Sequence, residues 1–206
     1  MLRPHQVSKR SHTALQDPIQ QFNQWWQAAV KDSPLRQKSA VCISTINKDG
    51  FPSGRYVDLK AVDKEGFVFC TYLDSDKGRD IVNNPKVALT AWWDHMGYQV
   101  RVTGQANAID DVKAQSYWQT RGRDAQLTTH AFAQSRPLDS QADLKSRFEA
   151  ISEAFRDKGV EKPQNWGGYC IAPQTIEFLT FQENRLHLRE KYLRLAQGWQ
   201  LQLLQP

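Results

Sequence analysis

Polar and apolar residues alternate along most of the first half of the chain with the period of a β-strand, whose successive side chains point to opposite faces. This pattern, or a short apolar run between turn residues, predicts strands at 39–47, 53–62, 67–73, 86–93 and 98–109. The sequence Lys48-Asp49-Gly50 predicts a hairpin turn between the first two. Consecutive strands joined by tight turns are typical of a barrel or a curled antiparallel sheet.

Apolar residues spaced three and four apart predict helices elsewhere. The first has Asp17 as N-cap and Pro18 at its first position. Its aromatic face carries Phe22, Trp25, Trp26 and Val30. Further helices are expected at 75–85, 110–121 and 138–159. The last has an apolar stripe and ends at Gly159; the stripe is Leu144, Phe148, Ile151 and Phe155.

The C-terminal part returns to strand patterns at 166–181, 184–195 and 198–204. In "NRLHLRE" (184–190), period two would place Arg185, His187 and Arg189 on one face. Leu186 and Leu188 would then lie on the other face, in a core. The alternative is an ordinary surface strand. The predicted class is α+β and mainly β: one β-barrel domain at 17–206 with flanking helices, after a mobile segment at 1–16.

Composition restricts the function classes. The 27 Lys and Arg are scattered among 22 Asp and Glu, so the formal charge of +5 favours a localised anionic ligand over nucleic acid. The three cysteines, Cys42, Cys70 and Cys170, are widely spaced and show no metal-binding motif, which predicts reduced, mostly buried thiols in a cytoplasmic protein and no metal. No signal peptide or membrane span is expected.

Three segments carry candidate chemistry for binding an anion. Arg55 and Lys60 in "GRYVDLK" (54–60) need a partner, either Asp58 or an anionic ligand, unless they are solvated edge charges. "CTYLDSDKGRD" (70–80) is a strand that runs into a helix start, where Ser75 and Lys77 could hold a phosphate; an ordinary capped helix is the alternative.

Tyr117 and Arg121 are four residues apart, so they share a helix face. Together they could bind a phosphate by charge-assisted hydrogen bonds, or they could form a surface stacking pair. Within 184–190, His187 is the side chain best suited to hold a proton near neutral pH.

In order and spacing, these motifs together with "YQVRVTGQA", "AQS", "WGGY" and "IEF" resemble the pyridoxamine 5'-phosphate oxidases, flavoenzymes with an FMN-binding split β-barrel. The resemblance extends over about residues 17–206. It implies a homodimeric FMN-dependent oxidase that converts pyridoxamine or pyridoxine 5'-phosphate to pyridoxal 5'-phosphate. Dioxygen would be the acceptor, and hydrogen peroxide would be released.

The resemblance also implies roles for individual residues. The cofactor would be bound by Arg55, Tyr56, Val57, Asp58, Leu59, Lys60, Cys70, Thr71, Ser75, Lys77, Gln99, Gln134, Ser135 and Arg189. Gln134 and Ser135 would come from the other subunit, together with Arg189. The substrate phosphate would contact Lys60, Tyr117 and Arg121. Arg185 and His187 would cover the substrate ring as the catalytic residues.

The chain departs from the family pattern at four places. Asp76 stands where an Arg is usual beside the FMN phosphate, Leu179 replaces an aromatic residue beside the flavin, and Ala125 replaces a Ser at the substrate phosphate. The N-terminal segment lacks the usual Arg and Tyr arrangement. Two alternatives therefore stay open: a diverged flavin oxidoreductase acting on another planar substrate, and a non-catalytic protein that binds FMN or pyridoxal 5'-phosphate.

Overall fold

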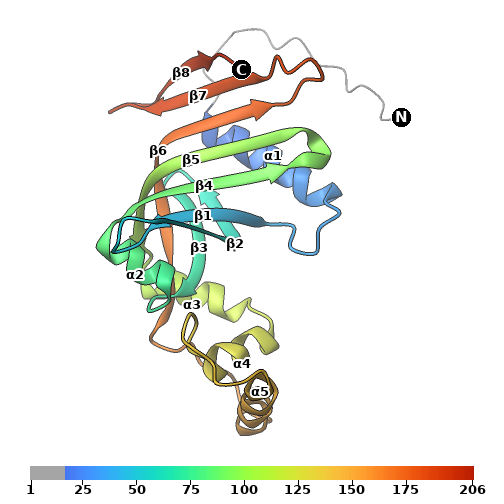
Figure 1. Cartoon of the computed structure of the whole chain (residues 1–206), viewed down its shortest axis with the longest axis vertical. Helices are drawn as coiled ribbons and strands as arrows, with labels where there is room; N and C mark the ends of the chain where they lie inside the picture. Colours follow the sequence, from blue (N-terminus) through green and yellow to red (C-terminus); the bar gives the residue numbers. More distant parts are fainter. Residues whose placement is uncertain (1–16) are drawn as a thin grey trace.

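The computed structural model describes residues 17–206 (Figure 1). The mobile segment expected at 1–16 and the departure noted there lie outside the described residues. Six antiparallel strands form a closed barrel in the order β3-β2-β1-β4-β5-β6, and pairing of β3 with β6 closes it. These strands are β1 (Ala40–Ile46), β2 (Pro52–Asp63), β3 (Gly66–Tyr72), β4 (Lys86–Trp93), β5 (Tyr98–Ala108) and β6 (Trp166–Thr180). The predicted α+β class and split-barrel fold are confirmed.

Two more strands extend the sheet beyond β6. They are β7 (Leu188–Arg194) and β8 (Trp199–Leu204), which pair in the order β6-β7-β8. Figure 1 shows them at the end of the molecule opposite to helices α3, α4 and α5. β6 therefore connects the two ends of the molecule, because its first residues pair with β3 and its last residues with β7.

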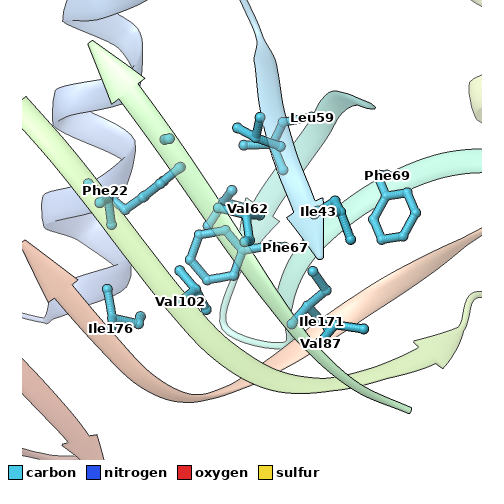
Figure 2. Packing of buried hydrophobic residues seen from close by; sticks show 14 of the residues in the cluster. Phe22, Ile43, Leu59, Val62, Phe67, Phe69, Val87, Val102, Ile171 and Ile176 are labelled. Atoms are coloured by element: carbon cyan, nitrogen blue, oxygen red, sulfur yellow. The ribbon is translucent and has the colours of Figure 1, made fainter. Parts of the chain in front are cut away.

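Apolar side chains at alternate positions of the strands fill the interior of the barrel. In β5, Val100 and Val102 are fully buried, whereas the neighbouring Arg101 and Thr103 are exposed. Figure 2 shows the interior, where Phe67 and Ile43 pack with other apolar side chains from several strands. Complete burial of such a side chain contributes about 1.5–3 kcal/mol to folding.

Five α-helices surround the barrel. They are α1 (Pro18–Asp32), α2 (Asp76–Asn83), α3 (Asp111–Gln119), α4 (Arg123–Ala131) and α5 (Ala142–Ala154); a short 3₁₀ helix, η1 (Asp94–Met96), precedes β5. As predicted, Asp17 caps α1 by accepting the Ile19 N–H, and Pro18 is its first residue. The Phe22 ring meets Phe67 edge to face with centroids 4.8 Å apart, which fixes α1 on the barrel.

The helices α3, α4 and α5 enclose a second apolar cluster around Trp118 and Trp166. Helix α4 was not predicted, and α5 ends at Ala154 rather than at Gly159. Of the predicted stripe on α5, Phe148, Ile151 and Phe155 pack against this cluster, whereas Leu144 is exposed. Beyond the end of α5, the Arg123 guanidinium donates to the carbonyls of Phe155 and Lys158.

The predicted strand at 184–195 begins only at Leu188, and the two-face reading of 184–190 is wrong. Arg185 has φ 62°, in the left-handed region, and the Asn184 side chain accepts the Leu186 N–H. This turn interrupts the alternation. Leu186 and Leu188 are 65% and 46% exposed in the single chain, so no buried face lies behind them.

Two further findings concern the cysteines and membrane spans. All three cysteines are unpaired, and each is partly exposed rather than buried. No helix among residues 17–206 is long and apolar enough to cross a membrane.

Candidate active site

A buried lysine occupies the start of α2. The Lys77 side chain is held at the end of β3, and its ammonium donates to Thr71 Oγ1 at 3.1 Å, Ser75 Oγ at 3.3 Å and Gln134 Oε1 at 2.7 Å. Lys77 is only 7% exposed. We refer to Thr71, Ser75, Lys77 and Gln134 as the Lys77 cluster. Ser75 also caps α2 by accepting the Gly78 N–H.

The charge of Lys77 has no carboxylate partner within ion-pair distance in the described part of the chain, since its hydrogen-bond acceptors are neutral oxygens. Burial, assisted by the nearby Arg55, lowers the pKa of Lys77 to about 8. A buried cation without a counter-ion is costly. A buried cation of this kind at the start of a helix fits a bound anion such as a phosphate.

Arg55 lies next to the Lys77 cluster, as expected, but its partner is not Asp58. Its guanidinium contacts the Asp80 carboxylate at 3.5 Å and donates to Thr45 Oγ1 at 2.7 Å. The Thr45 hydroxyl in turn donates to Asp80 at 2.6 Å. Asp58 instead pairs with Lys60 at 2.6 Å. The Arg55 guanidinium also donates to Ser53 Oγ at 2.8 Å. Because these three groups, Asp80, Thr45 and Ser53, hold Arg55 in place, its guanidinium is oriented before any ligand binds.

Gln134 and Ser135 were expected from the other subunit, and the structure differs. Gln134 contacts Lys77 within the same chain, and Ser135 Oγ accepts the Asp76 N–H at 3.2 Å. Ser135 has φ 69°. Among the described residues, the non-glycine residues with positive φ are Ser135 and Arg185, and both are predicted site residues. Such a backbone costs about 1–3 kcal/mol and is found mostly at functional sites.

Two cationic side chains, Lys60 and Arg121, and the Asp58 carboxylate act electrostatically on Cys70, the residue before Thr71. We call Lys60, Cys70, Tyr117 and Arg121 the Tyr117 cluster. Burial raises the pKa of the Cys70 thiol to about 11, and the nearby charges of Lys60 and Arg121 oppose this rise. Cys70 and Tyr117 pack against the same apolar cluster. Adjacent side chains of a strand point to opposite sides, so Cys70 and Thr71 serve different clusters.

Arg121 is oriented by an aromatic ring. Its guanidinium carbon lies 5.6 Å from the centroid of the Trp166 ring. Its Nε is buried and has no hydrogen-bond partner within residues 17–206. Burial raises the pKa of the Tyr117 hydroxyl, so this group stays protonated and can donate. A phosphate would supply acceptors for both residues.

A third set of predicted residues lies on the outer surface of the barrel. Gln99 pairs with Leu179, and Leu179 pairs with Arg189, so the three form one row across β5, β6 and β7, which we call the outer row. The Arg189 guanidinium donates to the Glu177 carboxylate at 3.0 and 2.7 Å. Glu177 is buried although it faces outward, because Arg189 and Arg101 cover it.

The predicted catalytic residues lie in the turn beside the outer row. Arg185 is exposed in the single chain, whereas His187 is half-buried. His187 Nδ1 accepts the Gln182 N–H at 3.0 Å, and its ring packs on Phe181 with centroids 5.1 Å apart. Since Nδ1 uses its lone pair in this bond, the proton of the neutral imidazole is on Nε2.

The predicted residues thus gather at two ends of the molecule. Cys70 pairs with Gly168 near the start of β6, and Arg189 pairs with Leu179 near its end. These positions on β6 are eleven residues apart, or roughly 36 Å along the strand at about 3.3 Å per residue. In one chain, the Lys77 and Tyr117 clusters are therefore remote from the outer row, Arg185 and His187.

The other expected cofactor residues follow β2. Tyr56 is exposed, Val57 packs against the core and Leu59 is buried inside the barrel. The Leu59 side chain cannot reach a ligand, so only its backbone is available.

The structure shows the contacts of two residues that depart from the family pattern, Asp76 and Ala125. Asp76 points to solvent and forms an ion pair with Arg79, three residues later, so its charge is partly compensated. Ala125 lies in the first turn of α4, where its carbonyl accepts the Thr129 hydroxyl at 2.8 Å.

Sequence reasoning missed Asp80, Glu177 and Trp166, which orient Arg55, Arg189 and Arg121. Glu177 lies between two apolar residues in "IEF", and Asp80 directly precedes the apolar pair Ile81-Val82; a buried carboxylate needs a cation. That signal was available, but it does not reveal the partner. Within residues 17–206, no group of three or more His, Cys, Asp or Glu is arranged to hold a metal ion.

Comparison with family models gives two matches. A model described as pyridoxamine 5'-phosphate oxidase matches residues 27–154. A second, described as the pyridoxine 5'-phosphate oxidase C-terminal dimerisation region, matches residues 166–206. The second match supports a homodimer, and it contains β6, β7, β8 and the turn with Arg185 and His187.

Individual proteins agree with these models. The chain is 40% identical over 190 residues to a pyridoxine/pyridoxamine 5'-phosphate oxidase of Rubrobacter xylanophilus, covering 92% of this chain and 87% of that protein. It is also 40% identical over 192 residues to the enzyme of that name from Teredinibacter turnerae, covering 93% and 90%.

Among solved structures, PhzG from Burkholderia lata, in complex with tetrahydrophenazine-1-carboxylic acid, has a TM-score of 0.85 and 26% identity, covering 92% of this chain and 93% of that one. An FMN binding protein from Nostoc punctiforme, related to pyridoxamine 5'-phosphate oxidase, shares the fold with a TM-score of 0.73 and 17% identity, covering 94% and 100%. From the family models and the 40% identical relatives, the chain belongs to the pyridoxamine 5'-phosphate oxidase family of oxidoreductases.

Proposed function

We propose that this protein is an FMN-dependent oxidase that converts pyridoxine or pyridoxamine 5'-phosphate to pyridoxal 5'-phosphate. With the alcohol, dioxygen is consumed and hydrogen peroxide is formed; with the amine, water is also taken up and ammonia released. The observation that carries this proposal is the pair of cationic clusters on β3, at Thr71 and Cys70, one for each of two phosphorylated ligands. The identity to curated oxidases of this name supports it.

The Lys77 cluster, with Arg55, would hold the FMN phosphate. The buried Lys77 ammonium has the charge and lacks the counter-ion that a phosphate would provide. Arg55 adds a second cation, oriented by Asp80 and Thr45. The chemistry that FMN supplies when bound is two-electron oxidation with dioxygen as the final acceptor.

The Tyr117 cluster would hold the substrate phosphate. Lys60 and Arg121 provide positive charge, and the protonated Tyr117 hydroxyl provides a donor. Charge-assisted hydrogen bonds contribute about 1.5–3 kcal/mol each. Fixing the phosphate limits the positions that the reacting carbon can take, which is a proximity effect.

The remaining groups would come from the second chain of a homodimer. The outer row, Arg185 and His187 are too remote along β6 to meet the clusters of their own chain. In a symmetric dimer, the C-terminal region of one chain can face the β3 end of the other. The family model for a dimerisation region covers this C-terminal part and supports the arrangement.

Arg185 and His187 would act on the substrate ring. His187 can donate a hydrogen bond from Nε2 to a substrate oxygen or nitrogen, since Nδ1 is occupied by the Gln182 N–H. The exposed Arg185 guanidinium can cover the ring and exclude water once the second chain is in place. In this role the protein binds, orients and sets the electrostatic field.

One experiment tests the function directly. The purified protein is examined for a flavin spectrum, and pyridoxine 5'-phosphate is added while peroxide and aldehyde are followed. A yellow protein that forms both products in equal amounts supports the proposal. A yellow protein that oxidises neither phosphorylated vitamer contradicts the substrate assignment. A colourless protein that does not bind added FMN contradicts the proposal that the protein is an FMN-dependent enzyme.

A second candidate is oxidation of a larger planar substrate by the same flavin. The similarity to PhzG, whose structure contains a tetrahydrophenazine carboxylic acid, favours it, as do Leu179 and Ala125 at two ligand positions. The intact Tyr117 cluster favours the phosphorylated substrate instead. A ligand without phosphate would leave Arg121 without a counter-ion among residues 17–206, whereas Lys60 already pairs with Asp58.

A further inference from the structure

Three aromatic side chains form a continuous strip beside the outer row. The Trp92 indole meets the Phe181 ring at 5.1 Å between centroids and an interplanar angle of 67°. The Phe181 ring meets the His187 imidazole at 5.1 Å and 78°. Both contacts are edge to face, the geometry that aromatic pairs prefer. We call Trp92, Phe181 and His187 the aromatic strip.

The strand register explains why these rings meet on the outer surface. Trp92 pairs with Gln99, so it lies on β4 next to the Gln99 end of the outer row. Phe181 is two residues after Leu179, so it faces the same side, and its N–H donates to the Gly97 carbonyl at 2.8 Å. Gly97, with φ 68°, lies beside Phe181, since a Cβ on Gly97 would be 3.7 Å from the Phe181 Cβ.

Trp92 differs from its neighbour Trp93, which is buried in the core. The indole of Trp92 is 51% exposed in the single chain. Leu179, in the middle of the outer row, is aliphatic and offers no flat surface. The aromatic strip supplies flat surfaces next to it instead, and one end of the strip is the histidine that we place at the substrate ring.

We propose that Trp92 and Phe181 are specificity-determining residues whose rings contact the flat aromatic ring of the substrate, and that Phe181 also positions His187. The inference rests on the proposed function, because it takes His187 to be at the substrate ring. The expected ligand is a planar aromatic molecule that consists of a single ring or of several fused rings. The flavin, by contrast, is assigned to the outer row.

The test measures ligand binding at equilibrium in the FMN-loaded protein. Two probes are used: 4-deoxypyridoxine 5'-phosphate, which has no group to oxidise, and phenazine-1-carboxylic acid. Trp92→Leu and Phe181→Leu remove a ring but keep apolar bulk, and Trp92→Phe keeps a ring. Phe51→Leu is the matched control, since Phe51 is an exposed aromatic residue in the turn between β1 and β2, at the other end of β4 from Trp92.

We expect Trp92→Leu and Phe181→Leu to raise the Kd of the probe that binds the wild type by about fivefold to tenfold, the scale of one aromatic contact. Trp92→Phe should restore the Kd to within about threefold of the wild type, and Phe51→Leu should leave it unchanged. The Kd of FMN and the elution volume of the dimer should not change. Retained FMN binding distinguishes a contact with the substrate from a general loss of structure.

Other outcomes overturn the inference. An unchanged Kd in both leucine variants shows that the aromatic strip does not contact the ligand, even if the wild type oxidises pyridoxine 5'-phosphate. Loss of the dimer together with FMN shows that Trp92 is a subunit contact. A wild type that binds neither probe also contradicts it. Conversely, if only the phenazine acid binds, and binds more weakly to Trp92→Leu, the inference stands and the vitamer assignment fails.

Discussion

Lys77 and Gln134 are 57 residues apart in the sequence, yet the Lys77 ammonium donates to Gln134 Oε1 at 2.7 Å within one chain. This bond joins the start of α2 to the segment that follows α4. The four residues of the Lys77 cluster therefore meet within a single chain. Under the proposed function, the residues that contact the rings would come from the partner subunit.

Replacing Lys77 by Met is expected to weaken cofactor binding without lowering the stability of the apo protein. The buried ammonium is costly without an anion, so the apo protein should be at least as stable as the wild type. FMN affinity should fall about tenfold to a hundredfold, because one or two charge-assisted hydrogen bonds are lost. Thermal unfolding and FMN fluorescence titration measure both. Lys48→Met, at an exposed position, is the control; a loss of stability without a change in FMN affinity would contradict the assignment.

Because of Lys77, the stability of the apo protein and its affinity for FMN should change in opposite directions with pH. Burial lowers its pKa from 10.5 to about 8 in the folded protein. Between these values the unfolded chain binds more protons, so the contribution of this group to apo-protein stability rises with pH from about 8 to 10.5. FMN affinity should instead decline above pH 8, since the phosphate requires the charged amine. Titrations from pH 7 to 10 test this, and Lys77→Met should show neither dependence.

Arg185→Ala should lower turnover more than flavin occupancy. Arg185 is exposed in the turn before β7 and is assigned to the substrate ring, whereas the Lys77 cluster is assigned to FMN. We expect kcat/KM to fall about tenfold to a hundredfold with FMN content unchanged, the effect of losing one charge-assisted contact. Steady-state kinetics and the ratio of flavin to protein absorbance give the two values. Equal losses of both would show that Arg185 contacts the cofactor.

Much of the fold was accessible from the sequence. Period two in "YQVRVTGQA" sets which side chains of β5 enter the barrel, and the cap at Asp17 and Pro18 sets the start of α1. Such local patterns act within one element, so they can be read without the partners. Ser75 as the cap of α2 follows from the same local chemistry, whereas the assignment of Lys77 to a phosphate stays a prediction.

The predictions from the sequence fail where contacts between residues distant in the sequence determine the local structure. Helix α4 has little apolar periodicity of its own and is stabilised by packing on Trp118 and Trp166. The strand expected at 184–187 is interrupted by the left-handed backbone of Arg185, which no hydrophobic pattern reveals. The partners of Arg55 and Arg189 are distant in sequence or on a neighbouring strand. Pairing across strands depends on register, and register is not visible in a single segment.

Glu177→Gln should destabilise the C-terminal part of the sheet. The Glu177 carboxylate accepts two hydrogen bonds from Arg189 and lies near Arg101. A neutral amide would leave both cations without their counter-ion, so the free energy of unfolding should fall by about 2 kcal/mol. Chemical denaturation measures this. Glu183→Gln, at an exposed position in the turn, should have little effect; equal stability of the two variants would contradict a structural role for Glu177.

The central claim is that one site combines Lys77 of one chain with Arg189 of the partner subunit. Mixed dimers of Lys77→Met and Arg189→Met chains test it, because they contain one intact site if the two residues belong to different chains. As the internal reference, mixed dimers of Lys77→Met and Gln134→Ala should contain none, since these residues meet within one chain. We predict that oxidation of pyridoxine 5'-phosphate recovers to about half of the wild-type rate per dimer in the first mixture and stays at the level of the parent variants in the second. Recovery only in the second mixture, or in neither, would contradict the account.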